Sequence, residues 1–248
     1  MQHEQIDSPL VSTSHSNNGH LIGDVDALII SAMEPYLAEH LNGYNIIFST
    51  LVIKKKGENT YTPPHQDASF VNELEDMAFN LWIPLVDTTA HNGCLRFLPG
   101  SHSLPLNPRP APIHPWAYQS VGEIIVKNMS DVSLKAGEPV AFHGACIHAS
   151  HPNLSAKERP SVVMAITNSD ARWIQYYCSD YQSNTIEEYP MKKENYVHYV
   201  KGSIPSPEPP ISRFVMKAPS MKAFYLKYQP WQLLKEFING KSLKPVAQ

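Results

Sequence analysis

The sequence predicts a mainly β protein, and three observations support this prediction. The chain contains 22 prolines, which favour loops and edge strands over a helix bundle. Short segments rich in β-branched and aromatic residues are separated by turn residues. At 248 residues, the chain is long enough for one well-filled all-β domain. We therefore expect a single domain over 1–248, with a core at about 45–170, an N-terminal arm and helix at 1–44, and a C-terminal extension at 171–248.

The first predicted element is a helix from Asp24 to His40, which follows a polar arm at 1–23. Apolar residues recur in it at intervals of three and four residues, and Asp24 can cap its start. Pro35 is expected to kink the helix or split it in two. Strands are predicted after it at 45–55, 78–86, 94–98, 123–127, 132–134, 139–148 and 161–167.

Proline-rich stretches lie between and after these strands. The connector at 104–119 has neither a helical nor a strand period, and it is either a functional lid or a variable surface loop. A second proline-rich stretch covers 201–213, and residues 230–240 have helix start and stop signals.

Bulk composition excludes several classes of function. The formal net charge is -3 and the pI is about 6.4, so no electrostatic nucleic-acid partner is indicated. Neither a secretory signal nor an apolar run of membrane-spanning length is found. The three cysteines form neither a disulfide framework nor a zinc knuckle, which favours a reducing compartment. We expect a cytoplasmic protein that is not bound to a membrane, and the sequence does not indicate its oligomeric state.

His65-Gln66-Asp67 places an imidazole and a carboxylate two residues apart. On an extended strand these side chains project from the same face, so both can reach one metal ion. An HxD pattern is expected about this often by chance, so it is weak evidence alone. The alternative interpretation is a surface turn after Pro63-Pro64 with no role in metal binding. A metal site of this kind also needs a second histidine.

The second histidine is expected on the predicted strand at 139–148. Alternation places His148 on the same face as the bulky Phe142, which is expected to point into the barrel, whereas His143 faces away unless a bulge intervenes. Arg159 lies eleven residues after His148, across a loop that joins neighbouring antiparallel strands. Its guanidinium offers a planar, two-pronged donor for a carboxylate. The alternative for Arg159 is a surface arginine paired with Glu158 or another acid.

Three segments resemble the phytanoyl-CoA dioxygenase family of Fe(II)/2-oxoglutarate oxygenases. They are HQD at 65–67, NLWIPLVDTTAHNGCLRFLPGSH at 80–102 and AGEPVAFHGACIHASHPNLSAKER at 136–159. Their order and spacing are specific, and the resemblance covers roughly 48–167. It implies a double-stranded β-helix, also called a jelly roll or cupin-like fold, with flanking α-helices and one iron near its open end.

The resemblance also implies roles for individual residues. The iron ligands would be His65, Asp67 and His148, and Arg159 would hold the distal carboxylate of 2-oxoglutarate. Ser150 matches a further cosubstrate contact, and Trp82 and Thr50 fall where family members line the cosubstrate pocket. Asn80 is a pocket candidate by strand alternation with Trp82 only. His102 is expected to be structural or to face the substrate.

The implied reaction uses Fe(II), 2-oxoglutarate and O2, hydroxylates a small-molecule substrate and releases succinate and CO2. A carboxylate at position 67 favours hydroxylation over halogenation, because the related halogenases have a small residue there; desaturation and ring formation remain open. The alternative is a non-redox metal cupin, such as an isomerase or a small-ligand binding module. The sequence does not identify the primary substrate, because the fold and the iron site do not determine it.

Overall fold

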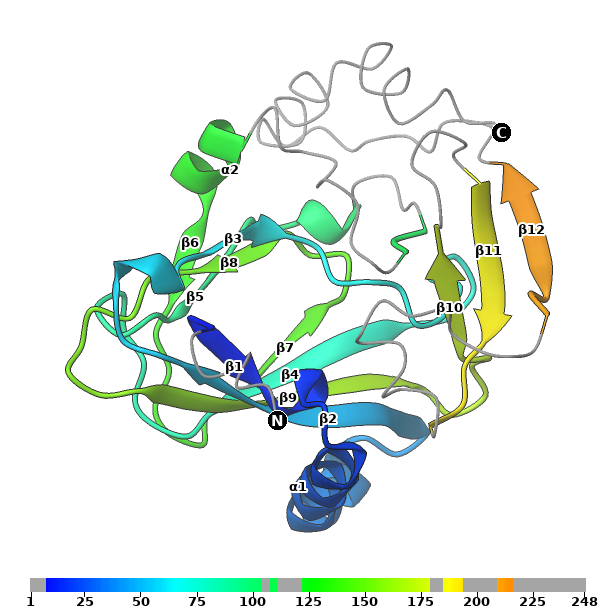
Figure 1. Cartoon of the computed structure of the whole chain (residues 1–248), viewed down its shortest axis with the longest axis horizontal. Coiled ribbons are helices and arrows are strands. Elements are labelled where there is room, and N and C mark those ends of the chain that lie inside the picture. Colours follow the sequence, from blue (N-terminus) through cyan, green and yellow to red (C-terminus); the bar gives the residue numbers. More distant parts are fainter. Residues whose placement is uncertain (1–7, 104–107, 111–121, 179–184, 194–208, 216–248) are drawn as a thin grey trace.

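The computed structural model describes residues 8–103, 108–110, 122–178, 185–193 and 209–215. Its two main sheets are antiparallel and face each other (Figure 1). The larger sheet has the strand order β1-β2-β9-β4-β7, and the smaller has the order β3-β8-β5-β6. This arrangement confirms the predicted jelly roll. The predicted connector at 104–119 lies mostly outside the described residues, and the predicted helix at 230–240 lies entirely outside them.

The larger sheet contains β1 (Leu10–Ser12), β2 (Tyr44–Lys54), β4 (Ala78–Pro84), β7 (Val140–His143) and β9 (Arg159–Asn168). The smaller sheet contains β3 (Thr62–His65), β5 (Leu95–Phe97), β6 (Ser130–Val132) and β8 (His148–Ser150). A third sheet consists of β10 (Ile174–Tyr177), β11 (Thr185–Pro190) and β12 (Ser212–Val215). Short 3-10 turns occur at Thr13–His15, Glu58–Thr60 and Ser101–Ser103.

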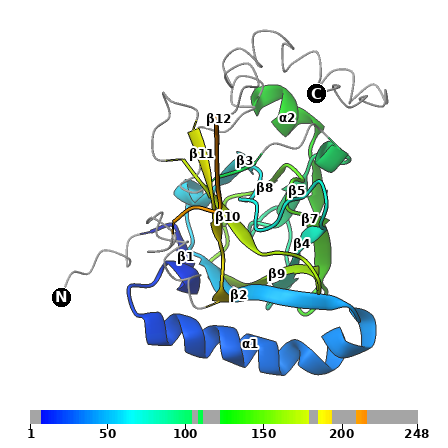
Figure 2. The ribbon, with the colours of Figure 1, turned by 90° about the vertical axis from the view of Figure 1, so that its right-hand side faces the viewer.

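The two faces of the larger sheet pack against different partners. Leu81, Val162 and Met164 point outward and pack against α1 (Gly19–His40), which runs along that face (Figure 2). Trp82 and Val163 point inward and pack with residues of the smaller sheet. Alternation along β4 and β9 thus leaves the inner face for functional side chains.

The helix α1 begins earlier than predicted. α1 begins five residues before Asp24, because the Asn18 side chain accepts hydrogen bonds from the backbone N–H groups of His20 and Leu21 and so caps the first turn. Pro35 lies inside the helix, which continues to His40, so of the two predicted outcomes, a kink or a split, the split does not occur. No helix in the described part of the chain is long and apolar enough to cross a lipid bilayer.

Three strand predictions require correction. Residues 123–127 lie in a helix, α2 (Gly122–Asn128), because an isolated apolar run of five residues fits either period. The strand predicted at 132–134 lies earlier, as β6, where Asp131 pairs with Arg96 of β5. The single strand predicted at 139–148 is divided into β7 and β8, which belong to different sheets. The backbone turns between them, where the Cys146 N–H donates to the His143 carbonyl.

Candidate metal centre

The register of the smaller sheet brings two predicted ligands together. His65 at the end of β3 lies directly opposite His148 at the start of β8, and their ring centroids are 4.2 Å apart. His148 is also opposite Phe97, a residue of the core between the sheets. Directly opposite residues share a face, so both imidazoles point into the barrel. Phe142 also faces this interior, with its ring 4.8 Å from that of His148, so the predicted shared face is confirmed. The premise of one continuous strand is wrong, because β7 and β8 belong to different sheets and the pairing of β8 orients His148.

Asp67 completes the group although it lies just beyond the end of β3. Its Oδ1 is 3.7 Å from His65 Nε2 and its Oδ2 is 3.7 Å from His148 Nε2. The three ligand atoms lie within 4.8 Å of one another, a spacing that one ion can bridge. Asn80 on β4 donates a hydrogen bond of 2.6 Å from Nδ2 to Asp67 Oδ2 and so orients the carboxylate.

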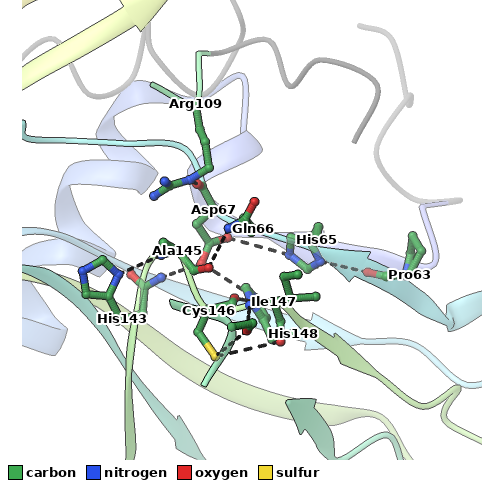
Figure 3. Close-up of polar contacts among 12 residues, drawn as sticks. Pro63, His65, Gln66, Asp67, Arg109, His143, Ala145, Cys146, Ile147 and His148 are labelled. Atoms are coloured by element: carbon green, nitrogen blue, oxygen red, sulfur yellow. Dashed lines mark hydrogen bonds and ion pairs between the residues drawn. The ribbon is translucent and has the colours of Figure 1, made fainter. Parts of the chain in front are cut away.

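Backbone carbonyls determine which nitrogen of each imidazole is available (Figure 3). His65 Nδ1 lies 2.9 Å from the Pro63 carbonyl, and His148 Nδ1 lies 3.0 Å from the Cys146 carbonyl. Because a carbonyl can only accept, each Nδ1 carries the proton and each Nε2 keeps its lone pair for a metal. Burial, and then the neighbouring His65, lower the pKa of His148 to about 4. His148 is therefore neutral at physiological pH, which is the form that a metal ligand requires.

Hydrogen bonds from the loop after β3 hold Asp67 against the turn between β7 and β8. The Asp67 N–H donates to the Gly144 carbonyl at 3.1 Å, and Gln66 Nε2 donates to the Ala145 carbonyl at 2.7 Å. Arg109 Nε donates to the Asp67 carbonyl at 2.5 Å (Figure 3). Sequence reasoning missed Gln66 and Arg109, because nothing in their local sequence indicates contact with the HxD segment.

Arg109 also forms an ion pair that is almost fully buried. Its Nη2 lies 2.6 Å from Glu73 Oε1, and the two side chains are 13% and 5% exposed. We expect Arg109→Met to lower the free energy of unfolding by about 3 kcal/mol, because Glu73 would keep a buried charge without its partner. Chemical denaturation measures this loss. Arg172→Met is the matched control, since the Arg172–Glu188 pair has a largely exposed arginine and should cost less than about 1 kcal/mol. Equal losses in the two variants would contradict the buried-pair argument.

Arg159 lies on the inner face of the larger sheet at the start of β9. It is 2% exposed, and its guanidinium carbon lies 5.1 Å from the centroid of the Trp82 ring. Nη1 donates to Ser161 Oγ at 2.8 Å, whereas Nε is buried without a hydrogen-bond partner. Burial lowers the pKa of Arg159 to about 10, so the guanidinium stays charged at neutral pH. The alternative interpretation, a surface arginine paired with Glu158, is wrong, because Arg159 is buried and Glu158 pairs with Lys55.

The remaining predicted pocket residues occupy different parts of this interior. Ser150 on β8 is 4% exposed and lies opposite Thr62 and Leu95. Thr50 on β2 and Trp82 on β4 both pair with Val163 of β9, so they share the inner face. The Thr50 hydroxyl contacts the hydroxyls of Ser12 and Thr13, which fastens the N-terminal segment to the sheet.

Two other histidines considered from sequence lie outside the group. The rings of His102 and His143 are 6.1 Å apart, and His143 Nδ1 accepts the Ala145 N–H. Neither belongs to the triad of ligand atoms.

A second group of possible metal-binding atoms is formed by Cys94, Asp131 and His151. There Asp131 is already bonded to Arg96 and to His151, so its charge is neutralised within the protein.

A family model described as phytanoyl-CoA dioxygenase matches residues 5–161. The chain belongs to this family. A phytanoyl-CoA dioxygenase of Arabidopsis thaliana is 32% identical over 182 residues, which cover 63% of this chain and 60% of that protein. The phytanoyl-CoA dioxygenase domain-containing protein 1 of Bos taurus is 31% identical over 121 residues, covering 46% and 42%. The chain thus spans less than two thirds of these curated relatives.

Solved structures similar to this member of the phytanoyl-CoA dioxygenase family include two that hold a metal ion and 2-oxoglutarate, also called alpha ketoglutarate. The epimerase SnoN in complex with Fe3+, alpha ketoglutarate and nogalamycin RO is 26% identical, with a TM-score of 0.45 over 66% of this chain and 64% of SnoN. HygX from Streptomyces hygroscopicus, with nickel and 2-oxoglutarate bound, is 13% identical, with a TM-score of 0.44 over 65% and 71%.

Proposed function

We propose that this protein is an Fe(II)- and 2-oxoglutarate-dependent dioxygenase that hydroxylates a small molecule. The observation that carries the proposal is the convergence of His65 Nε2, His148 Nε2 and the Asp67 carboxylate on one point inside the barrel. Membership of the phytanoyl-CoA dioxygenase family supports it. The cytoplasmic location and the single-domain organisation stay predictions.

The donor set fits Fe(II). Two neutral imidazoles and one carboxylate form the facial arrangement that suits non-haem iron and leaves coordination positions open. His148 does not have to lose a proton when the metal binds, because burial already lowers its pKa to about 4. The Nδ1 hydrogen bonds of both histidines and the Asn80 bond to Asp67 fix the ligands before the metal arrives.

Arg159 fits the distal carboxylate of 2-oxoglutarate. A charged guanidinium with an unpartnered Nε lies on the inner face of the barrel, with Trp82 covering it. A carboxylate there would satisfy the orphaned donor and would form a charge-assisted hydrogen bond. Ser150 and Thr50 are proposed as further contacts of the cosubstrate, because both have buried hydroxyl-bearing side chains on inner faces of the two sheets.

Iron, 2-oxoglutarate and O2 would supply the oxidising chemistry when bound, with release of succinate and CO2. The chain's own contribution is to orient the ligands and to keep His148 neutral. The carboxylate of Asp67 fills the position that must be open for halide, which supports oxygen insertion.

The test of this proposal measures cosubstrate binding and turnover separately. Purified protein is loaded anaerobically with Fe(II), and 2-oxoglutarate is added while the visible metal-to-ligand charge-transfer absorption is recorded. Air is then admitted with candidate small molecules, and succinate is quantified. Appearance of the absorption and of succinate supports the proposal. A metal-loaded protein that binds no 2-oxoglutarate would instead be a non-redox metal cupin.

Asn80 is expected to affect the metal through Asp67. Asn80→Leu removes the hydrogen bond to Asp67 Oδ2, and loss of an outer-shell partner typically weakens metal affinity by about 10- to 100-fold. Competition with a metal-binding dye measures this change. Asn45→Leu is the control, since Asn45 Nδ2 bonds the exposed Ser169 carbonyl, and this change should leave the metal affinity unchanged. Equal affinity in the Asn80 variant would contradict the orienting role.

A further inference from the structure

Lys54, the last residue of β2, is a lysine with no solvent exposure. Its Nζ makes three hydrogen bonds: it donates to the Thr60 carbonyl at 2.5 Å and to the His151 carbonyl at 3.0 Å, and it bonds Thr62 Oγ1 at 3.2 Å. The Thr62 hydroxyl can accept from the ammonium form or donate to the neutral amine, so this geometry suits both protonation states. Thr62 lies on β3 with His65, and His151 directly follows β8 with His148. The amino group therefore links the two strands that carry the histidines.

The surrounding chain is shaped around this side chain. Gly93 has a φ of 88°, and a Cβ there would lie only 2.7 Å from Lys54 Cδ. The Asn92-Gly93 turn thus leaves room for the lysine stem. Asn153 Nδ2 donates to the Lys54 carbonyl, which fixes the end of β2. The position of the amine is therefore set from several directions.

Lys54 lies directly opposite Arg159 in the β2–β9 register. Directly opposite residues share a face, so two buried basic side chains lie next to each other beside the proposed cosubstrate site. Within the described part of the chain, no carboxylate forms an ion pair with either. The ionisable groups that act on Lys54 are Arg159 and the thiol of Cys94, while the neighbouring Lys55 and Glu158 pair with each other.

This environment opposes the charge of Lys54. Burial is the main cause that lowers the pKa of Lys54 to about 7, and repulsion by Arg159 adds to it, whereas Cys94 acts weakly in the opposite direction. Because no carboxylate among the described residues offsets these effects, the amine is only partly protonated at neutral pH. An anion bound to Arg159 would favour the ammonium form and so raise this pKa.

We propose that Lys54 is a second cation of the cosubstrate site, which takes up a proton from solvent when the distal carboxylate of 2-oxoglutarate binds to Arg159. This inference rests on the proposed function. Lys54 acts as a positioning residue. Its charge adds to the positive potential beside Arg159, and its hydrogen bonds hold β3 and the end of β8 together. Because binding and protonation are linked, the affinity for 2-oxoglutarate should fall as pH rises above neutrality.

Calorimetry of 2-oxoglutarate binding to the Zn(II)-loaded protein tests the inference without turnover. Titrations at pH 8 in two buffers of different ionisation enthalpy give the number of protons taken up per ligand. We expect wild-type protein to take up most of one proton, and Lys54→Met to take up correspondingly less. Lys55→Met is the matched control at the neighbouring, more exposed lysine and should behave as wild type.

The pH dependence of binding is a second measurement. The wild-type Kd for 2-oxoglutarate should rise by up to about tenfold per pH unit above neutrality, and Lys54→Arg should remove this dependence.

A comparison of ligands on the wild-type protein needs no variant to fold. 2-Oxopentanoate has the same chain length as 2-oxoglutarate but lacks the distal carboxylate, so its binding should not be coupled to the Lys54 proton. Equal proton uptake with the two ligands, or equal uptake by wild type and Lys54→Met, would overturn the inference while the proposed function stands. Absence of any 2-oxoglutarate binding to metal-loaded wild type would overturn both.

Discussion

Asp67→Ala is expected to abolish succinate formation and to weaken Fe(II) binding. The loss should exceed the roughly 100-fold effect of removing an outer-shell partner, because Asp67 is the anionic member of the proposed ligand set and lies 3.7 Å from both imidazole Nε2 atoms. Without its charge, two neutral histidines would hold the dication. Metal content after gel filtration and succinate formation under air measure the two effects.

The control for this experiment is a histidine outside the ligand group. His102→Ala removes an imidazole near His143 but none of the three converging atoms, so metal content should equal that of wild type. His148→Ala should reproduce the loss seen with Asp67→Ala. Full activity of either ligand variant would show that the ligand assignment is wrong.

Arg159→Met is expected to raise the Kd for 2-oxoglutarate by about 100-fold, which corresponds to about 3 kcal/mol for a buried, hydrogen-bonded charge pair. Fe(II) affinity should change little, because Arg159 belongs to the larger sheet and contacts Ser161 and Trp82. Anaerobic titration of the Fe(II) protein with 2-oxoglutarate measures the Kd. Arg159→Lys should recover only part of the affinity, since lysine lacks the planar two-pronged donor.

The control for the cosubstrate site is Arg96→Met, which removes a guanidinium that pairs with Asp131 on the smaller sheet. This variant should keep the wild-type Kd for 2-oxoglutarate. A Kd that is unchanged in Arg159→Met would contradict the proposed cosubstrate clamp, even if the metal ligands prove correct.

Strands with a long alternating or apolar pattern could be predicted from the sequence. β2, β4 and β9 were predicted within a few residues, because each is long enough to separate a strand period from a helical one. Short segments carried too little information. The run at 123–127 is helical, and only Ile125 within it is fully buried. The third sheet was not predicted, because β10 and β12 are four-residue strands whose pairing depends on distant partners.

The candidate site was predicted more completely than the loops that support it. The three proposed ligands converge in the structure, and their role as ligands stays a prediction. Contacts such as Arg109 with the Asp67 carbonyl, and Lys54 with the His151 carbonyl, join segments far apart in the chain. The local sequence does not indicate which distant segments meet in the fold, so these contacts could not be predicted from it.

The pairing of His65 with His148 has a consequence for folding. These residues become neighbours only after β3 and β8 have come together across more than eighty positions of sequence, and long-range pairings of this kind form slowly. An ion that binds only the assembled triad would stabilise the native state by mass action. The metal would therefore stabilise the pairing of β8 with β3, the edge strand of the smaller sheet, and apparent thermal stability should depend on the free metal concentration.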